Sequence, residues 1–333
     1  MFGQIQHELQ KVDSVCQRSE CPTFHDPFCT LNGYLGIVKI PFFFQHSYLK
    51  NIQLSTTTNF PLKTFQISLM DSRPKNPPKL ILGICLQPIF YLFSPKLLIS
   101  FFEYWISQDI TLFYIYRHSW SSEVQKVFEF YLKHPKIIVK LIDWSDLSPS
   151  QNKIENNLNP NKFFRRLEFS LAMADCVYRS RSETKYLIMT DLDEIIYIKS
   201  RKTVKKFIQT KATQNISAFW FSSAKIIGKS NLTLIWKYLE KPIQSKLIIN
   251  TQLTKTTNVH NPGDSEVSSK NNIVDIHPNE AVIVHSRFDY ENANESINSN
   301  ILSMKGLLML QSNLDFHVKK VFKILKIPYS NTF

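Results

Sequence analysis

The sequence KYLIMTDLDEII, residues 185–196, joins an apolar run directly to a cluster of acidic side chains. The continuous apolar run at 186–190 predicts a strand that is buried on both faces. Asp191 and Asp193 follow that strand, and residues two apart in an extended chain share a face. Two hard oxygen donors placed in this way suit Mg²⁺ or Mn²⁺, which share their remaining positions with phosphate groups and water.

Strand and helix signals alternate on the N-terminal side of this stretch. Further apolar runs predict strands at 80–86, 112–116 and 137–142. The segments between them predict helices at 96–108, at 121–133 and at 162–179, the first opened by the Ser94-Pro95 pair. This alternation predicts an α/β fold in which a mostly parallel sheet is flanked by helices. Ligands of such sheets bind outside the carboxyl ends of the strands, where the acidic cluster lies.

Outside this alternating region the pattern is that of strands. Additional strands are expected at 216–221, 247–249 and 281–284, and short strands fit the first 75 residues best. The segment SRPKNPPK at 72–79 can continue neither a helix nor a central strand. We therefore expect a small N-terminal β-rich region at 1–75 and a larger α/β domain at 76–333.

The composition is globular and basic. Hydrophobic residues make up 43% of the 333 residues, and 40 Lys and Arg against 27 Asp and Glu give a formal charge of +13. A positive surface invites polyanions, so a basic protein that binds them is an alternative reading. The chain lacks paired CxxC zinc spacing, an RNP-type motif and an RGG tract, so no nucleic-acid partner is expected. It also lacks GxGxxG and GxxxxGK[ST], which removes the usual support for dinucleotide and P-loop sites.

Cysteines and sequons bear on the cellular compartment. Five cysteines allow at most two disulfides, and three of the five lie in the first thirty residues, where a disulfide fits a secreted protein. The alternative is that all five are thiols. The sequons at Asn215, Asn231 and Asn294 are compatible with the secretory route. No apolar stretch of the length of a signal peptide is visible in residues 1–20.

The order and spacing of several motifs resemble glycosyltransferase family 92. The likeness covers roughly residues 80–290 and is most specific at DLDE with the preceding Asp175-Cys176 helix. The motifs that carry it are Cys85-Leu-Gln-Pro88, Phe102-Glu-Tyr-Trp105, Leu112-Phe-Tyr-Ile-Tyr116, Trp144, Ala174-Asp-Cys176, KYLIMTDLDEII at 185–196, Lys246-Leu-Ile-Ile249, His260 and His285-x-Arg287.

The resemblance implies a GT-A-like fold and the transfer of a hexose, galactose foremost, from a UDP-sugar to a glycan acceptor on a glycoprotein or glycolipid. It implies inversion and dependence on Mn²⁺ or Mg²⁺. On that reading Asp191 and Asp193 hold the metal. Both also belong to the donor-binding site together with Glu194, which shapes that site or forms a hydrogen bond in it. His285 would complete the metal shell, with His260 as its alternative.

The resemblance also suggests residues around the donor and a place in the cell. Arg287 and Lys246 could contact the diphosphate of the donor. Inversion needs a carboxylate base, for which Asp264, Glu266 and Asp289 lie in the right downstream region. The family implies the lumen of the Golgi and a membrane anchor, which this sequence does not display. His285-Ser286-Arg287 departs from the HYR of the family, so an inactive relative that serves as a binding or scaffold protein is a further alternative.

Overall fold

The computed structural model describes a subset of the chain. The described residues are 13–16, 34–38, 50–55, 64–146, 161, 169–213, 215–230, 233–238, 245–254, 272–285, 301–303 and 305–329.

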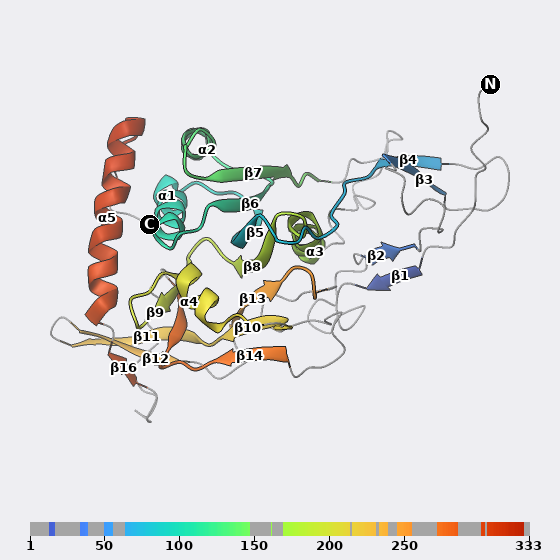
Figure 1. The fold of residues 1–333 in the computed structure, drawn as a ribbon. Helices are drawn as coiled ribbons and strands as arrows, with labels where there is room; N and C mark the ends of the chain where they lie inside the picture. Colours follow the sequence, from blue (N-terminus) through green and yellow to red (C-terminus); the bar gives the residue numbers. More distant parts are fainter. Residues whose placement is uncertain are drawn as a thin grey trace, which may run out of the picture.

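A seven-stranded mixed sheet forms the centre of the molecule (Figure 1). Its strand order is β14-β10-β13-β8-β5-β6-β7. The neighbours β8, β5, β6 and β7 are all parallel, β13 is antiparallel to both β8 and β10, and β14 is parallel to β10. The strands are β5 (Leu80–Ile89), β6 (Leu112–Arg117), β7 (Ile138–Asp143), β8 (Thr184–Thr190), β10 (Ala218–Phe221), β13 (Lys246–Asn250) and β14 (Ile273–Ile276). The expected α/β architecture, with a mostly parallel sheet flanked by helices, is confirmed.

Helices connect the parallel strands as the sequence predicts. α1 (Pro95–Ser107) begins after Ser94, whose hydroxyl accepts a hydrogen bond from the backbone N–H of Leu97 at 3.3 Å. α2 (Ser122–Leu132) is capped in the same way by Ser121. α3 spans Phe169–Ser180. It covers the second part of the helix predicted at 162–179, and residues 162–168 lie outside the described residues.

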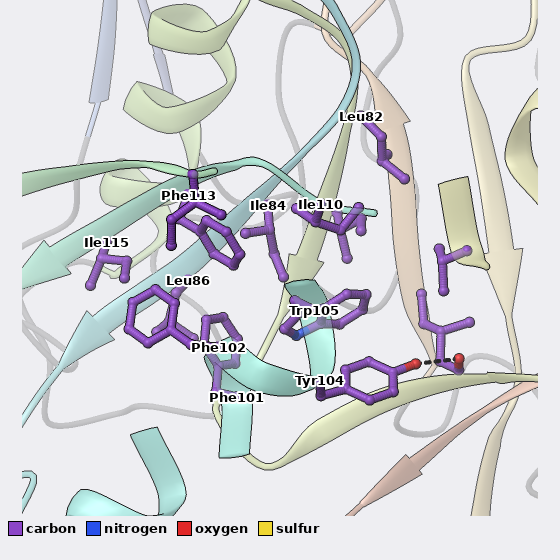
Figure 2. Packing of buried hydrophobic residues seen from close by; sticks show 14 of the residues in the cluster. Leu82, Ile84, Leu86, Phe101, Phe102, Tyr104, Trp105, Ile110, Phe113 and Ile115 are labelled. Carbon is purple, nitrogen blue, oxygen red and sulfur yellow. Dashed lines mark hydrogen bonds between the residues drawn. The ribbon is translucent and has the colours of Figure 1, made fainter. Parts of the chain in front are cut away.

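Both faces of the central sheet are buried. Alternate residues of β5 point to opposite sides: Ile84 and Leu86 pack with α1 and α2, whereas Cys85 packs with α3. Figure 2 shows the first of these layers, where Phe101, Phe102 and Trp105 of α1 pack against the sheet. This burial on both sides explains why the parallel strands are continuous apolar runs in the sequence.

A second sheet lies beside the central one and was not expected from the sequence. Its order is β16-β12-β11-β15-β9, formed by β9 (Glu194–Ile198), β11 (Ser223–Ser230), β12 (Thr233–Tyr238), β15 (Ala281–His285) and β16 (Ile301–Ser303). The run predicted as a strand at 281–284 therefore belongs to this sheet. The hydroxyl of Tyr104 on α1 donates a hydrogen bond of 2.6 Å to the carbonyl oxygen of Ile196 and ties β9 to the core (Figure 2).

Two further helices were also unforeseen. α4 (Val204–Lys211) follows β9, and α5 (Lys305–Leu325) packs along α1 and α2 at the side of the molecule (Figure 1). Within the described ranges, no helix is both long enough and apolar enough to cross a membrane.

The N-terminal region contains short strands, in line with its sequence. β1 (Asp13–Cys16) pairs with β2 (Tyr34–Ile37), and β3 (Asn51–Ser55) pairs with β4 (Thr64–Ser68), each as a two-stranded antiparallel sheet. The domain boundary near residue 75 stays a prediction.

One disulfide joins Cys85 of β5 to Cys176 of α3. Both residues are fully buried. The sequence indicated a possible disulfide only among the three cysteines of the first thirty residues, so this pairing was missed. The reason is that the two cysteines are 91 residues apart and meet only when α3 covers the sheet.

Candidate active site

A cleft of about 790 Å³ opens at the carboxyl ends of the four neighbouring parallel strands. Gln87 lines it from the end of β5, His118 from the residue after β6, Asp146 from the segment after β7, and Asp191 and Asp193 from the residues after β8. The topology therefore gathers polar side chains from four separate segments at one edge of the sheet, which is where an open α/β sheet binds ligands.

Asp191 lies at the floor of this cleft and is held from two sides. The side-chain amide of Gln87 donates a hydrogen bond to Oδ1 of Asp191. The ammonium of Lys246 donates to Oδ2 at 2.9 Å. The Asp191 side chain keeps 28% of its surface exposed, whereas that of Lys246 keeps 3%. The carboxylate is thus fixed in orientation while part of it still faces the cleft.

Glu194 lies beneath Asp191 and is almost fully buried, with 2% of its side chain exposed. Its carboxylate accepts a hydrogen bond of 2.9 Å from the backbone N–H of Asp191, and its Oε1 lies 3.3 Å from Nζ of Lys246. Nε2 of His285 lies 3.0 Å from the same oxygen. Glu194 therefore links the turn after β8 to β13 and to β15 of the second sheet.

These contacts shift the ionisation of the cluster. Burial raises the pKa of Asp191, and the neighbouring Glu194 adds to that effect, which together outweigh Lys246. Burial alone would raise the pKa of Glu194, but the hydrogen bond from His285 and the charge of Lys246 hold it below its usual value. Burial would lower the pKa values of Lys246 and His285, yet the adjacent carboxylates keep both raised. The cluster is thus a set of ion pairs centred on Glu194.

The acidic turn fits a divalent cation that shares its shell with a substrate. Mg²⁺ and Mn²⁺ are commonly held by one or two carboxylates together with phosphate oxygens and water. Asp191 and Asp193 both line the cleft and supply that minimum. Across the described part of the chain, no three His, Cys, Asp or Glu side chains converge as a complete protein-made cage. The donor set therefore suits a metal that arrives with, or is completed by, a phosphate ligand.

Aromatic rings also line the cleft. His118 lies near Phe90 and Tyr91, with ring centroids 4.8 and 6.0 Å away, and Tyr91 is 70% exposed. Nε2 of His118 lies 3.2 Å from a carboxylate oxygen of Asp146, and Nδ1 lies 2.9 Å from the hydroxyl of Ser119. Because a carboxylate only accepts, a neutral imidazole here carries its proton on Nε2 and accepts from Ser119 at Nδ1. This network fixes a flat polar ring on the wall of the cleft.

The sequence profile of glycosyltransferase family 92 matches residues 81–326, a range that contains the central sheet, the cleft and the acidic turn. The chain belongs to glycosyltransferase family 92. No relative among curated proteins matches it.

Several solved structures are similar to this family 92 chain over part of their length. They include the mannosyltransferase PcManGT from Pyrobaculum calidifontis in complex with GDP-Man and Mn²⁺ (11% identity, TM-score 0.29, 46% of this chain and 38% of that one). The galactosyltransferase LgtC in complex with donor and acceptor sugar analogues has 12% identity and a TM-score of 0.29, over 52% of this chain and 58% of that one. S. aureus TarS 1–349 in complex with UDP-GlcNAc has 11% identity and a TM-score of 0.33, over 72% and 66%. This chain thus spans less than half of the mannosyltransferase, and the family assignment rests on the profile match.

The structure brings five of the residues singled out in the sequence into one neighbourhood. Asp191 and Asp193 line the cleft, while Lys246 contacts both Asp191 and Glu194, and His285 contacts Glu194. Nε2 of His285 is directed at Glu194, and its Nδ1 lies 3.4 Å from the hydroxyl of Ser223. The other candidates lie outside the described residues; they are His260, Asp264, Glu266, Arg287 and Asp289.

Three residues of the cleft carried no role in the sequence analysis. Gln87, His118 and Asp146 each follow or end a predicted parallel strand. A rule that polar residues at the carboxyl ends of parallel strands point to a ligand would have found them. Neighbouring strands are separated by long helical crossovers, so proximity in the chain gives no sign that these side chains share a cleft.

Proposed function

We propose that this family 92 glycosyltransferase transfers a hexose, galactose foremost, from a UDP-sugar to a glycan acceptor, with inversion and with the help of Mn²⁺ or Mg²⁺. The observation that carries the proposal is the cleft at the carboxyl ends of β5, β6, β7 and β8, which is lined both by the carboxylates of Asp191 and Asp193 and by aromatic rings. A nucleotide sugar fits this lining, because its diphosphate binds a metal that the carboxylates can hold and its flat base can stack on the rings.

Asp191 and Asp193 would hold the metal through oxygen atoms that face the cleft. When bound there, a divalent ion neutralises the charge that develops on the leaving diphosphate. Asp191 is preset for this role by Gln87 and Lys246, which hold its carboxylate without filling every acceptor position. Glu194 is too deeply buried to reach the donor and instead anchors the turn that carries both aspartates.

The aromatic rings that line the cleft are proposed to receive the nucleobase. The exposed ring of Tyr91 and the fixed ring of His118 offer flat surfaces against which a base can stack. Asp146 holds the imidazole in place through Nε2. The carboxylate that activates the acceptor hydroxyl is proposed to come from the downstream segment that holds Asp264, Glu266 and Asp289.

Calorimetric titration of UDP and UDP-galactose, in Mn²⁺ or in EDTA, tests the donor site. We expect binding that needs metal and is lost in Asp193→Asn. Asp275→Asn makes the same chemical change on the exposed side of edge strand β14, outside the cleft, and should bind like the wild type. A folded wild-type protein that binds neither nucleotide would favour the scaffold role. Binding of polyanions without metal, steeply weakened by salt, would favour the basic binding protein.

Transfer itself is tested by a glycan-acceptor screen with UDP-galactose and other UDP-hexoses. The variant that combines Asp191→Asn with Asp193→Asn should lose transfer while it keeps the thermal unfolding of a folded protein. Metal-dependent transfer retained in that variant would overturn the assignment of the acidic turn. Inversion is read from the anomeric configuration of the product.

We further propose that the protein acts in the lumen of the secretory pathway, with the Golgi and an anchoring membrane as the family suggests. The buried Cys85–Cys176 disulfide supports this placement because structural disulfides persist in oxidising compartments. Asn215 of the first sequon is exposed in the turn before β10. Since β10 and β8 are both antiparallel to β13, that turn lies at the edge of the sheet opposite the cleft, where a glycan would leave the site open.

Expression in a eukaryotic cell behind a cleavable leader tests the compartment. We expect a glycosidase-sensitive increase in mass that falls by one glycan in Asn215→Gln, and a Cys85–Cys176 peptide in the digest. Secretion with Asn215 unmodified and both cysteines reduced would speak against a secretory protein.

A further inference from the structure

We infer that Lys246 is a positioning residue of the donor site, which acts through Asp191 and Glu194 and not by touching the donor. The inference rests on the proposed function, in which Asp191 serves the metal and the diphosphate. The observation that supports the inference is the burial of Lys246, whose side chain is only 3% exposed. Its ammonium lies 2.9 Å from a carboxylate oxygen of Asp191 and 3.3 Å from one of Glu194. Lys246 is absent from the lining of the cleft.

The sheet explains how the lysine reaches this place. Lys246 is the first residue of β13, which runs antiparallel to β8 with Ile248 opposite Ile188. Two further steps along this register put Lys246 opposite Thr190, the last residue of β8 and the neighbour of Asp191. On its other side, Lys246 pairs with Phe221 of β10. The backbone of Lys246 therefore lies between β8 and β10, and its ammonium reaches the acidic turn at the carboxyl end of β8.

Lys246 and Gln87 together fix the rotation of the Asp191 carboxylate. Gln87 donates to Oδ1 and Lys246 donates to Oδ2, so the group is held at both oxygens. An ionised carboxylate has about four acceptor positions, so these two bonds leave capacity for a ligand in the cleft. Without the ammonium, Oδ2 would lose its partner and the carboxylate would be free to turn about the bond to Cβ.

Lys246 also balances charge in a turn that contains three carboxylates within four residues, Asp191, Asp193 and Glu194. Glu194 is buried, so its charge has little water to stabilise it and depends on Lys246 and His285. Carboxylates this close repel when they lack a cation. The ammonium thus permits Asp191 to stay at the cleft while Glu194 stays ionised beneath it.

The test is a pair of double-mutant cycles on the full chain. We expect Lys246→Met to weaken the binding of UDP with Mn²⁺ by about tenfold, the loss of one charged hydrogen bond, and to lower the urea midpoint without metal. In the Asp191→Asn and Glu194→Gln backgrounds, Lys246→Met should lower the urea midpoint much less, because fewer uncompensated carboxylates remain. Lys246→Arg keeps the charge and should restore part of both losses.

Asn250→Ala is the matched control because it lies on the same strand and is also buried, but its amide bonds to the carbonyl of Ile216, away from the cleft. It should lower the urea midpoint and leave the affinity for UDP unchanged. If Lys246→Met behaves like Asn250→Ala, the lysine is structural only and the inference fails. If Lys246→Met lowers the urea midpoint equally in all backgrounds, the lysine does not act through these carboxylates and the inference fails.

The proposed function and this inference fail in different ways. A wild-type chain that binds neither Mn²⁺ nor UDP contradicts the proposed function, while the urea cycles, which use no ligand, still decide the role of Lys246. If Lys246→Met alone does not fold, the double variant Lys246→Met/Glu194→Gln is compared in urea unfolding with the single variant Glu194→Gln. Folding restored by the second change supports the inference, and folding still lost overturns it.

Discussion

The Glu194 carboxylate is 3.0 Å from Nε2 of His285, and this pair joins the acidic turn of the central sheet to the last strand residue of β15 in the second sheet. Glu194 and His285 are also register partners in the antiparallel pair of β9 and β15. The second sheet is thus part of the site, because one of its strands begins at the carboxylate that supports Asp191.

Glu194→Ala should destabilise the fold strongly. Removing this carboxylate leaves the buried Lys246 with Asp191 as its remaining ion-pair partner among the described residues, and it takes the acceptor from the backbone N–H of Asp191. Breaking a buried ion pair in this way costs about 3–5 kcal/mol. Urea unfolding measures the effect. Glu129→Ala, the same change at an exposed position of α2, should alter stability by less than about 0.5 kcal/mol. Equal stabilities for the two variants would contradict the role of Glu194.

Replacing Cys85 and Cys176 together by Ala should lower the free energy of unfolding. A cross-link that closes a loop of 91 residues is expected to contribute about 4–5 kcal/mol through the entropy of the unfolded chain. Unfolding in urea with and without dithiothreitol measures it: the reductant should weaken the wild type and leave the double variant unchanged. If dithiothreitol leaves the free energy of unfolding of the wild type unchanged, the disulfide contributes nothing to stability.

His118→Ala should weaken the binding of UDP by about tenfold or more, since it removes a ring against which a base can stack. The requirement for Mn²⁺ should remain, because the proposed metal ligands are Asp191 and Asp193. His134→Ala makes the same change after α2, outside the cleft, and should bind UDP normally. Isothermal titration measures the affinity of both variants for UDP. Equal affinities would contradict the proposal that the base stacks on His118.

Stability should fall in acid partly through Glu183, which accepts hydrogen bonds from Tyr114 and Lys140. Partial burial acts to raise the pKa of Glu183, but the bonds from Lys140 and Tyr114 and the charge of Lys140 outweigh it, so that the pKa is lowered from 4.5. A lowered folded pKa means that the contribution is complete above about pH 4.5 and is lost as the pH falls through the folded value.

Urea midpoints of the wild type and Glu183→Gln between pH 3 and 6 test this contribution. The variant should lose less stability than the wild type across the acid range. Parallel curves would mean that Glu183 titrates alike in the folded and unfolded chains.

The sequence predicted every strand of the central sheet except β14, and part of the site. Continuous apolar runs predicted β5, β6, β7 and β8 within one to three residues at most ends, because strands buried on both faces tolerate few polar residues. Ser94 and Ser121 marked the starts of α1 and α2, since a cap is a local contact between residues three apart. Asp191 and Asp193 were found because they directly follow a buried strand. The shared face expected for an extended chain was wrong, because the chain turns at Leu192 and Asp193.

Tertiary structure alone decided which distant residues meet. The pairing of Cys85 with Cys176, the place of His118 and Asp146 in one cleft, and the second sheet depend on contacts between segments separated by whole elements, which leave no periodic trace in the chain. Lys246 is the clearest case. A lysine at the start of a strand is compatible with a phosphate contact, but the antiparallel register of β13 against β8 buries it behind Asp191. Charge and residue type are local properties of a sequence, whereas burial and partners arise only when the sheet is assembled.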